Sequence, residues 1–279
     1  MLFFIKSFVL KLIPTLIRRK LYEYFSRKKL NKIPNIHCDI RNLAALSDYN
    51  ISDALNNNSL LLSWEEDKKI ISNFNIPKMS GGINPGDQKA IYFLIKHFGF
   101  QKILEVGTHL GSSTVASALA IKSSDKSVLI TVDLNDVNDE KTTPWKNYGA
   151  AFSPKKMIKK INLSDKVNFF VDSSISFMSK WDDKFDLIFL DGDHSSHNVY
   201  QEIPLALKLL KPNGIILLHD FFPEGKPIWK NKVPDKGPFL AIKRILSENR
   251  GINLLPLGEL PWKTKLNTNK TSLAIISKK

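Results

Sequence analysis

Short apolar runs alternate along this chain with longer stretches in which apolar residues recur every three or four positions. The runs have the length and composition of strands buried on both faces, and the stretches have the period of helices that bury one side. Strands that alternate with helices predict a parallel sheet with helices on both faces. The runs expected to form parallel strands cover residues 103–106, 128–132, 167–171, 185–190 and 215–218.

Two more strands are expected over residues 252–257 and 272–277. No long crossover separates them, which favours an antiparallel hairpin at one edge of the sheet. We therefore expect an α/β fold: a doubly wound, Rossmann-like, mostly parallel seven-stranded sheet with an antiparallel edge hairpin. Residues 81–279 would form this domain, and residues 1–80 would form a basic amphipathic and helical N-terminal extension.

Local signals set some of the helix boundaries. Ser112 or Ser113 is expected to cap the helix after the first strand, because serine is a favoured N-cap residue. Pro204 is expected to break the helix after the fourth strand into two pieces. The residues Lys-Pro-Asn-Gly at 211–214 predict a turn before the fifth strand.

Residues 103–113, Ile-Leu-Glu-Val-Gly-Thr-His-Leu-Gly-Ser-Ser, predict a strand that turns on glycines into a helix. Such a turn presents backbone N–H groups and the positive end of the helix dipole at the carboxyl edge of the sheet, where open α/β folds bind ligands. The spacing Glu-x-Gly-x-x-x-Gly lacks one glycine of the dinucleotide fingerprint. Glu105 would repel a pyrophosphate but suits an ammonium or sulfonium group. A turn without a ligand is the alternative.

Acidic residues follow four of the five parallel strands and share one edge of the predicted sheet: Asp133, Asp172, Asp191 and Asp220. Asp133, at the tip of the second strand, is placed to accept hydrogen bonds from both hydroxyls of a ribose. Asp172 and Ser173 could contact the edge of an adenine, or they could simply cap the next helix.

The densest group of ionisable residues follows the fourth and fifth strands and comprises Asp191, Asp193, His194, His197, His219 and Asp220. Asp191 and Asp220 are expected on adjacent strand tips, close enough to share a cation. Two carboxylates with water suit Mg²⁺ or Mn²⁺, and an added imidazole favours a transition metal. Histidines that are merely polar residues at loop edges are the alternative.

In this order the motifs resemble those of the class I S-adenosylmethionine-dependent methyltransferases, especially the metal-linked bacterial O-methyltransferases of sugars and natural products (methyltransferase family 24). The matching elements are Leu-Glu-x-Gly-x-x-x-Gly at 104–111, Asp-Gly-x-His at 191–194, Leu-Lys-Pro-x-Gly at 210–214 and the pair at 219–220. The resemblance implies an enzyme that transfers a methyl group from S-adenosylmethionine to a hydroxyl of a small polar acceptor (a sugar, glycan or natural product), assisted by a divalent metal, Mg²⁺ or Mn²⁺.

The resemblance also implies roles for single residues. Asp191 and His194 would be catalytic, with His194 taking the proton, and Asp191, His219 and Asp220 would bind the metal. Two departures weaken the metal assignment: Phe221 stands where catechol-type enzymes carry Asn, and His219 stands where the macrolide-sugar type carries Glu. The residues expected to hold the cofactor are Glu105, Gly107, Thr108, Gly111, Ser113, Asp133, Asp172 and Ser173.

The chain has 41 Lys and Arg residues against 27 Asp and Glu. Residues 1–32 hold nine basic residues and one acid, so the excess is largely terminal, which argues against a nucleic-acid groove spread over the fold. The same segment carries apolar residues at helical spacing, as in a helix that lies on an anionic membrane surface. Packing of this helix on the domain or on a partner subunit is the alternative.

Cysteine usage and the N-terminus bear on location and on competing functions. A single cysteine, Cys38, and no signal-peptide cleavage site predict a cytoplasmic protein, with peripheral contact at the inner face of the membrane. A homo-oligomer is compatible with the sequence.

An NAD-dependent Rossmann oxidoreductase is a competing function, but the missing glycine speaks against it. A non-catalytic, membrane-tethered module is another, and it leaves the acids and histidines unexplained.

Overall fold

A computed structural model describes residues 15–77, 82–230 and 233–279 of the chain. Its strands are β1 (Lys102–Val106), β2 (Val128–Asp133), β3 (Val167–Val171), β4 (Phe185–Leu190), β5 (Leu210–Leu218), β6 (Ile252–Pro256) and β7 (Ala274–Lys278). Its α-helices are α2 (Thr15–Leu30), α3 (Asp48–Leu55), α4 (Leu61–Asn73), α5 (Pro85–Phe98), α6 (Ser112–Ala120), α7 (Pro154–Lys160), α8 (Ser174–Lys180), α9 (Ser196–Lys208) and α10 (Gly237–Glu248). Residues 1–14, the first part of the predicted basic segment, lie outside the described residues.

The strands form one seven-stranded sheet in the order β3-β2-β1-β4-β5-β7-β6. Strands β1 to β5 pair in parallel, and β7 pairs antiparallel with both β5 and β6. The predicted Rossmann-like sheet with an antiparallel edge is therefore confirmed. The register aligns Val106 of β1 with Val132 of β2 and with Leu190 of β4, so these three strands end at the same level.

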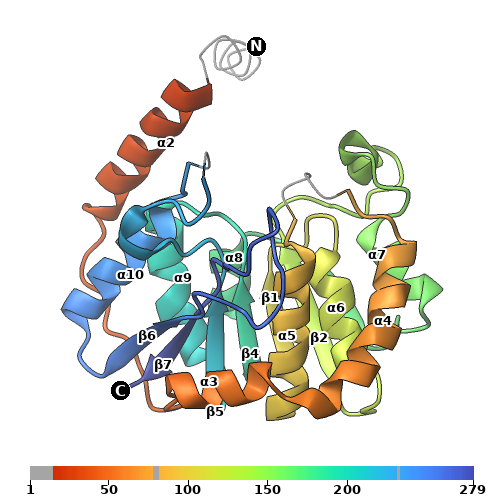
Figure 1. The fold of residues 1–279 in the computed structure, drawn as a ribbon. Helices are drawn as coiled ribbons and strands as arrows, with labels where there is room; N and C mark the ends of the chain where they lie inside the picture. Colours follow the sequence, from red (N-terminus) through yellow and green to blue (C-terminus); the bar gives the residue numbers. More distant parts are fainter. Residues whose placement is uncertain (1–14, 78–81, 231–232) are drawn as a thin grey trace.

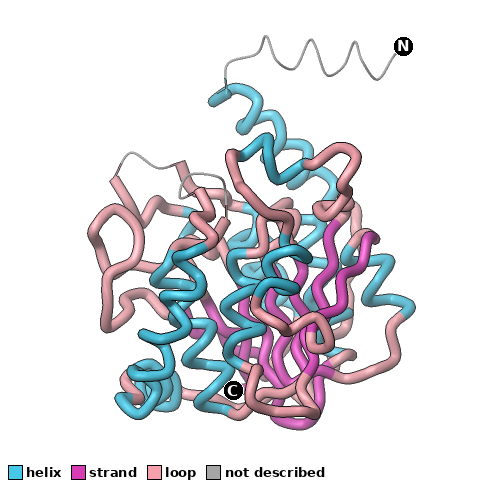
Figure 2. Tube along the Cα trace, turned by 90° about the vertical axis from the view of Figure 1, so that its right-hand side faces the viewer, coloured by secondary structure: helices cyan, strands magenta, loops and turns pink. Residues whose placement is uncertain are grey.

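Helices cover both faces of the sheet (Figures 1 and 2). Successive residues of a strand point to opposite sides of the sheet. Ile103 of β1 belongs to a core that it shares with α3 to α7, whereas Leu104 belongs to a second core formed with α2, α8, α9 and α10. The central strands β1, β2 and β4 are apolar at most positions because both of their faces are buried, whereas the edge strand β3 is largely exposed. This two-sided burial explains the continuous apolar runs of the sequence.

The predicted cap of α6 is wrong. Gly111 is the N-cap residue, with φ 76° and no side-chain cap hydrogen bond, while Ser112 and Ser113 lie inside the first turn of the helix. The chain must reverse tightly between β1 and α6, and glycine adopts the left-handed conformation that this reversal requires without a steric penalty. The backbone geometry of the turn has therefore overridden the capping preference of serine.

Two other local predictions are also wrong. Pro204 lies inside α9, which is continuous, because burial of Ile203, Pro204 and Leu207 against the sheet offsets the backbone hydrogen bond that proline cannot donate. Residues 211–214 lie within β5 and not in a separate turn. Asn213 there has φ 63°, and the pairing of β4 with β5 shifts in register between Phe185 and Leu187. The Lys-Pro-Asn-Gly sequence at 211–214 therefore marks an irregularity within β5.

The N-terminal extension packs closely on the rest of the chain. Leu43 and Ala45 form isolated bridges with residues Gly214 and Lys278, and α3 and α4 contact α5 and α6. Helix α2 lies against α9 and α10, and the guanidinium of Arg244 donates to the carbonyl at the end of α2. Figure 1 shows α2 extending upward from the body of the molecule. No helix in the described part of the chain is long and apolar enough to cross a membrane.

Candidate active site

The turn after β1 packs against the end of β4. Gly107 has φ 98°, and a Cβ atom there would lie 2.2 Å from the carbonyl oxygen of Asp191. The N–H of Gly107 donates to the carbonyl of Val132, 2.8 Å away, so the turn also holds the end of β2. Only glycine combines this φ with so close an approach to neighbouring backbone. The turn then leads into α6, whose N-terminal N–H groups lie at the same edge of the sheet.

A cavity of about 520 Å³ lies at this edge of the sheet. Small-molecule sites typically enclose roughly 300–1,000 Å³, so the cavity has the size of a cofactor site. Its walls come from the glycine turn, from the residues that follow β2, β3 and β4, and from the starts of α6 and α8. The predicted site residues that line it are Gly107, Thr108, Ser113, Asp133, Asp172, Ser173, Asp191 and His194.

Asp133 lies at the tip of β2 with its carboxylate fixed from two sides. One oxygen, Oδ2, accepts a hydrogen bond from the N–H of His109 at 2.9 Å, and Oδ1 accepts one from the N–H of Asn135 at 3.0 Å. Each carboxylate oxygen has a further lone pair available. Asp133 is therefore held in the cavity wall with acceptor capacity left for the hydroxyls of a ribose.

Two residues expected to hold the cofactor do not line the cavity. The carboxylate of Glu105 is buried behind the turn, where Oε2 accepts hydrogen bonds from the hydroxyls of Thr114 at 2.5 Å and Thr131 at 2.6 Å. Burial raises the pKa of Glu105 to about 7, although these hydroxyls lower it. Glu105 faces α6 because strand residues alternate between the two sides. Gly111 faces α7, where a Cβ atom would lie 2.9 Å from Pro154.

Asp172 and Ser173 line the cavity and also cap a helix. Ser173 is the N-cap residue of α8, and its hydroxyl accepts a hydrogen bond from the N–H of Ser176. The hydroxyl of Ser176 in turn donates to Oδ2 of Asp172 at 2.9 Å. The capping role is therefore confirmed, and the pair also lines the cavity, whereas its contact with an adenine stays a prediction.

Four members of the predicted cluster, Asp191, His194, His219 and Asp220, lie together next to the cavity. Asp193 also lines the cavity, whereas His197 lies against Ser26 of α2 and does not join the cluster. The Nε2 atom of His194 lies 3.7 Å from Oδ1 of Asp191 and 3.6 Å from Oδ2 of Asp220. The Nδ1 atom of His219 lies 2.8 Å from Oδ1 of Asp191, outside hydrogen-bond geometry, so this contact is an ion pair. On its other side, the Nε2 atom of His219 lies 3.5 Å from the buried carboxylate of Asp87. His194 and Asp191 face the cavity, whereas His219 lies behind them.

The carboxylates set the protonation of His219. Burial by itself would lower the pKa of His219, but the charges of Asp191 and Asp220 outweigh this and raise it well above its usual value. Burial would likewise raise the pKa of Asp220, but the two imidazoles lower it below its usual value. The flanking carboxylates therefore favour the protonated form of the buried His219 imidazole.

The residues near this cluster do not fit the predicted divalent metal. In the described part of the chain, no three His, Cys, Asp or Glu side chains are arranged to hold a metal ion. The predicted ligands Asp191, His219 and Asp220 do lie together, but the His219 ring faces the Asp191 carboxylate at ion-pair distance. Phe221 is buried and offers no oxygen or nitrogen ligand.

The structure adds site residues that the sequence did not single out. Tyr148 lines the cavity and packs edge-to-face on His109, with ring centroids 4.7 Å apart. Tyr22 of α2 donates its hydroxyl to Oδ1 of Asp193 at 2.6 Å, and Asp193 lines the cavity. The sequence signal that could have pointed to Tyr148 is the long polar loop over residues 134–152, because loops of this length are uncommon unless they are functional. Nothing local marks Tyr22 because its contact spans 171 positions.

Comparisons with known proteins point to methyltransferases. A family model described as a methyltransferase domain matches residues 104–221, which run from β1 to just after β5. The chain is 27% identical over 222 residues to a probable caffeoyl-CoA O-methyltransferase 3 of Dictyostelium discoideum, a match covering 77% of this chain and 80% of the relative. It is 24% identical over 192 residues to a caffeoyl-CoA O-methyltransferase of Stellaria longipes, covering 64% and 73%.

Solved structures share the fold. An O-methyltransferase from Bacillus cereus in complex with SAH matches with a TM-score of 0.53 and 21% identity, covering 83% of this chain and 96% of that one. The SAH-bound methyltransferase PaMTH1 of Podospora anserina matches with a TM-score of 0.51 and 18% identity, covering 96% and 98%. At these identities the likeness is one of fold.

The fold and the matches to a methyltransferase domain and to O-methyltransferases support the predicted class I S-adenosylmethionine-dependent methyltransferase. It is an O-methyltransferase, as the order of its motifs predicts. The two competing functions, an NAD-dependent oxidoreductase and a non-catalytic module, receive no support from the comparisons.

Proposed function

We propose that the protein methylates a hydroxyl group of a small polar acceptor, such as a sugar, a glycan or a natural product, and that His194 removes the proton. One observation carries the proposal: the imidazole of His194 lines the cavity, and its Nε2 atom lies 3.7 Å from Asp191 and 3.6 Å from Asp220. Imidazole is the side chain best suited to accept a proton near neutral pH.

The transfer needs both alignment and proton removal. The new bond forms between the acceptor oxygen and the methyl carbon while the bond from that carbon to the sulfonium sulfur breaks. The electron pair of the broken bond stays on sulfur and neutralises it, leaving S-adenosylhomocysteine. The hydroxyl proton passes to His194, and the carboxylates of Asp191 and Asp220 stabilise the resulting imidazolium. Because a neutral hydroxyl is a poor nucleophile, the base and the in-line alignment together provide the acceleration.

The lining of the cavity supports a polar acceptor. Beyond His194, the wall includes Asp193, Asn198 and Ser174, all with hydrogen-bonding side chains. Asp193 is held in place by Tyr22 on one oxygen and by the amide of Asn198 on the other. Fixed polar groups of this kind recognise an acceptor through hydrogen bonds. The names of the relatives suggest instead the phenolic hydroxyl of a caffeoyl ester, which is the competing acceptor class.

Assistance by a divalent metal is not part of the proposal. Asp191 is already ion-paired with His219, and the described donor set lacks a three-ligand arrangement. The charge that develops on His194 is instead balanced by carboxylates of the protein itself.

The test compares His194→Ala with the wild type in donor binding and in transfer. S-adenosylmethionine binding is measured by calorimetry, and transfer of a labelled methyl group is measured with sugars, glycans and a caffeoyl ester. We expect unchanged donor affinity and a rate lowered by about 10²–10⁴-fold, the usual effect of losing a general base. His197→Ala is the control, because His197 faces Ser26 of α2 at 3.4 Å and does not line the cavity.

Three results would contradict parts of the proposal. Near-normal transfer by His194→Ala beside an inactive His197→Ala would assign the base to the other imidazole. Faster transfer to the caffeoyl ester than to every polar acceptor would refute the acceptor class. Loss of activity in a chelator, with recovery on addition of Mg²⁺, would show that the enzyme uses a metal and would restore Asp191, His219 and Asp220 as its expected ligands.

A further inference from the structure

Helix α2 has an inner face that is bound to the catalytic domain. Ser26 and Leu30 are buried, and the hydroxyl of Ser26 lies 2.8 Å from the hydroxyl of Ser196 at the start of α9. Tyr22 donates to Asp193, next to the cavity. Burial and the Asp193 carboxylate raise the pKa of Tyr22, so the phenol stays protonated and keeps donating. These contacts fix which side of α2 faces outward.

The outer face of α2 exposes a stripe of large apolar residues. Ile17, Leu21 and Tyr24 follow one another at the i, i+4, i+7 spacing of a single helix face, and Phe25 lies beside them. Their exposed fractions are 48%, 40%, 60% and 55%. The rings of Tyr24 and Phe25 pack edge-to-face with centroids 5.4 Å apart. Such a group of exposed apolar side chains indicates a surface that something covers.

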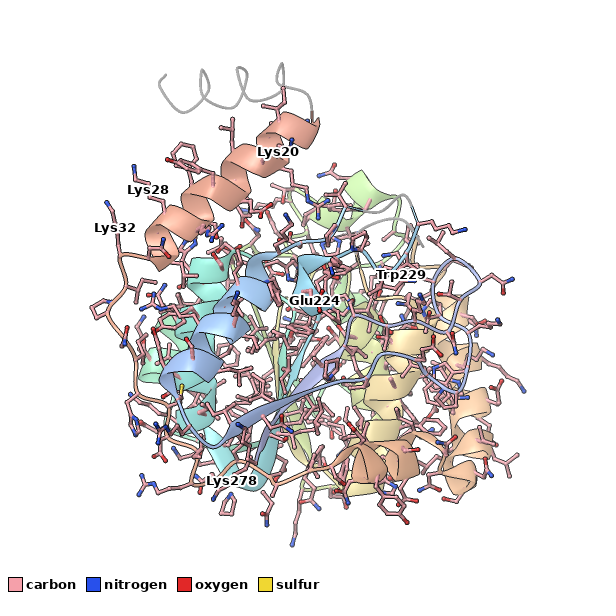
Figure 3. All side chains as sticks on the ribbon, turned by 60° about the vertical axis from the view of Figure 1, so that its left-hand side comes forward. Lys20, Lys28, Lys32, Glu224, Trp229 and Lys278 are labelled. Carbon is pink, nitrogen blue, oxygen red and sulfur yellow. The ribbon has the colours of Figure 1, made fainter. Side chains whose placement is uncertain are left out.

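Basic side chains surround the stripe. The exposed residues are Lys20, Arg27, Lys28, Lys29 and Lys32. None of these five is ion-paired with a side chain in the described part of the chain. Figure 3 shows Lys20, Lys28 and Lys32 along the outer side of α2 and the segment that follows it, pointing away from the domain. The covering partner must therefore be both apolar and negatively charged.

We propose that this outer face, formed by the apolar stripe and its five basic neighbours, docks α2 lengthwise onto an anionic lipid bilayer. Apolar and aromatic side chains on one face with Lys and Arg around them are the signature of a helix that lies in the membrane interface. Each basic side chain gains from the negative potential of the lipid headgroups. A second copy of this chain fits less well, because pairing two such faces would bring like charges together.

Docking would also place the cavity close to the lipid. The inner face of α2 contacts Asp193 in the cavity wall while the outer face meets the headgroups, so one helix links the two. The docking surface itself contains no residue of the proposed transfer step. Membrane binding can therefore be tested separately from methyl transfer.

The test is flotation of the full-length chain with vesicles of phosphatidylcholine containing phosphatidylglycerol, and with vesicles of phosphatidylcholine alone. We expect binding only to the anionic vesicles, weakened by added salt because salt screens surface charge. Lys20→Gln, Lys28→Gln and Lys32→Gln together should lower the partitioning by roughly a hundredfold. Leu21→Ser with Tyr24→Ser should lower it as well, because less apolar area enters the interface.

A matched control separates local from overall charge. Lys69→Gln, Lys126→Gln and Lys159→Gln remove the same charge from exposed positions on or near α4, α6 and α7, on the opposite side of the molecule from α2 (Figure 1). This triple variant should bind anionic vesicles like the wild type, and S-adenosylmethionine binding by every variant checks folding. Wild-type flotation by both α2 variants would overturn the proposal. Absence of vesicle binding by the wild type would also overturn the proposal. This includes results in which the face binds RNA instead, or forms a dimer detected by light scattering.

Discussion

Asp133 shows how the fold orients a single residue that is proposed to hold the methyl donor. Its carboxylate could swing freely at the end of a strand, but the N–H groups of His109 and Asn135 hold one oxygen each. The side chain therefore enters the cavity already oriented, and little conformational entropy is lost when a ligand binds. Ion pairs fix the nearby side chains in a similar way: His219 contacts Asp191, and His194 contacts Asp220.

We expect Asp133→Ala to weaken S-adenosylmethionine binding by about 1–3 kcal/mol, because ribose hydroxyls would lose their acceptor. Calorimetry on the folded variant measures this. Asp125→Ala is the matched control, since Asp125 is an exposed acid just before β2, at the other end of the same strand. Equal affinities of Asp133→Ala and the wild type would remove the ribose role from Asp133.

At the scale of elements, the site depends on the close approach of the β1 turn to the end of β4. The side chain of Glu105 lies behind this turn and anchors it to α6 and β2 through two hydroxyls, so it supports the site without facing the cavity. Gly237, at the start of α10, makes a similar approach to the backbone of His194. The loop that carries the proposed base is thus held between two glycines from different elements.

Gly107→Ala should destabilise the protein by at least about 3 kcal/mol, because a Cβ atom would meet the Asp191 carbonyl at 2.2 Å and the φ of 98° is strained for alanine. Gly99→Ala is the comparison: Gly99 also has positive φ, 66°, but a Cβ atom there has no neighbour within 4 Å. Its cost should be only about 1 kcal/mol. Urea unfolding measures both, and similar losses for the two variants would show that contact with β4 is unimportant.

At the scale of the whole molecule, buried acids set how stability responds to pH. Glu202 of α9 is buried, with Ser174 as its hydrogen-bond partner, and burial raises its pKa to about 7 against 4.5 for an ordinary Glu. At Glu202 the folded state therefore binds more protons than the unfolded state between these values, so the contribution of Glu202 to stability falls as pH rises from about 4.5 to 7. Burial raises the pKa of Glu105 to about 7 as well, so both residues act in the same direction.

Replacing Glu202 by Gln should remove its share of this pH dependence. Relative to the wild type, Glu202→Gln should gain stability above pH 7, by about 3 kcal/mol at most, and gain none near pH 4. Melting temperatures measured across this range provide the test, with the exposed Glu66→Gln as control. A Glu202→Gln curve parallel to that of the wild type at all pH values would contradict the assignment.

The sequence by itself determined the sheet, most of its strand boundaries and the residues that gather at its carboxyl edge. This was possible because strands buried on both faces are continuous apolar runs, and because parallel strands deliver their following residues to one edge. Asp133, Asp191 and His194 were found in this way, each from its position after a strand. Local turn and helix signals were less reliable: the cap at Gly111 and the continuity of α9 depend on packing that single residues do not encode.

Only the tertiary structure decided how residues distant in sequence act on one another. It turned the Glu105 side chain behind the glycine turn, because alternation along a strand in a two-sided core fixes that direction. It brought Asp87 and Asp191 from separate segments to His219, which already has Asp220 as its neighbour in sequence, and so made His219 an ion-pair partner. It also brought Tyr22 of α2 to Asp193 and thereby chose which face of a basic helix is buried and which is exposed. Sequence periodicity gives a helix its faces, but contacts with the other elements decide which face meets the solvent.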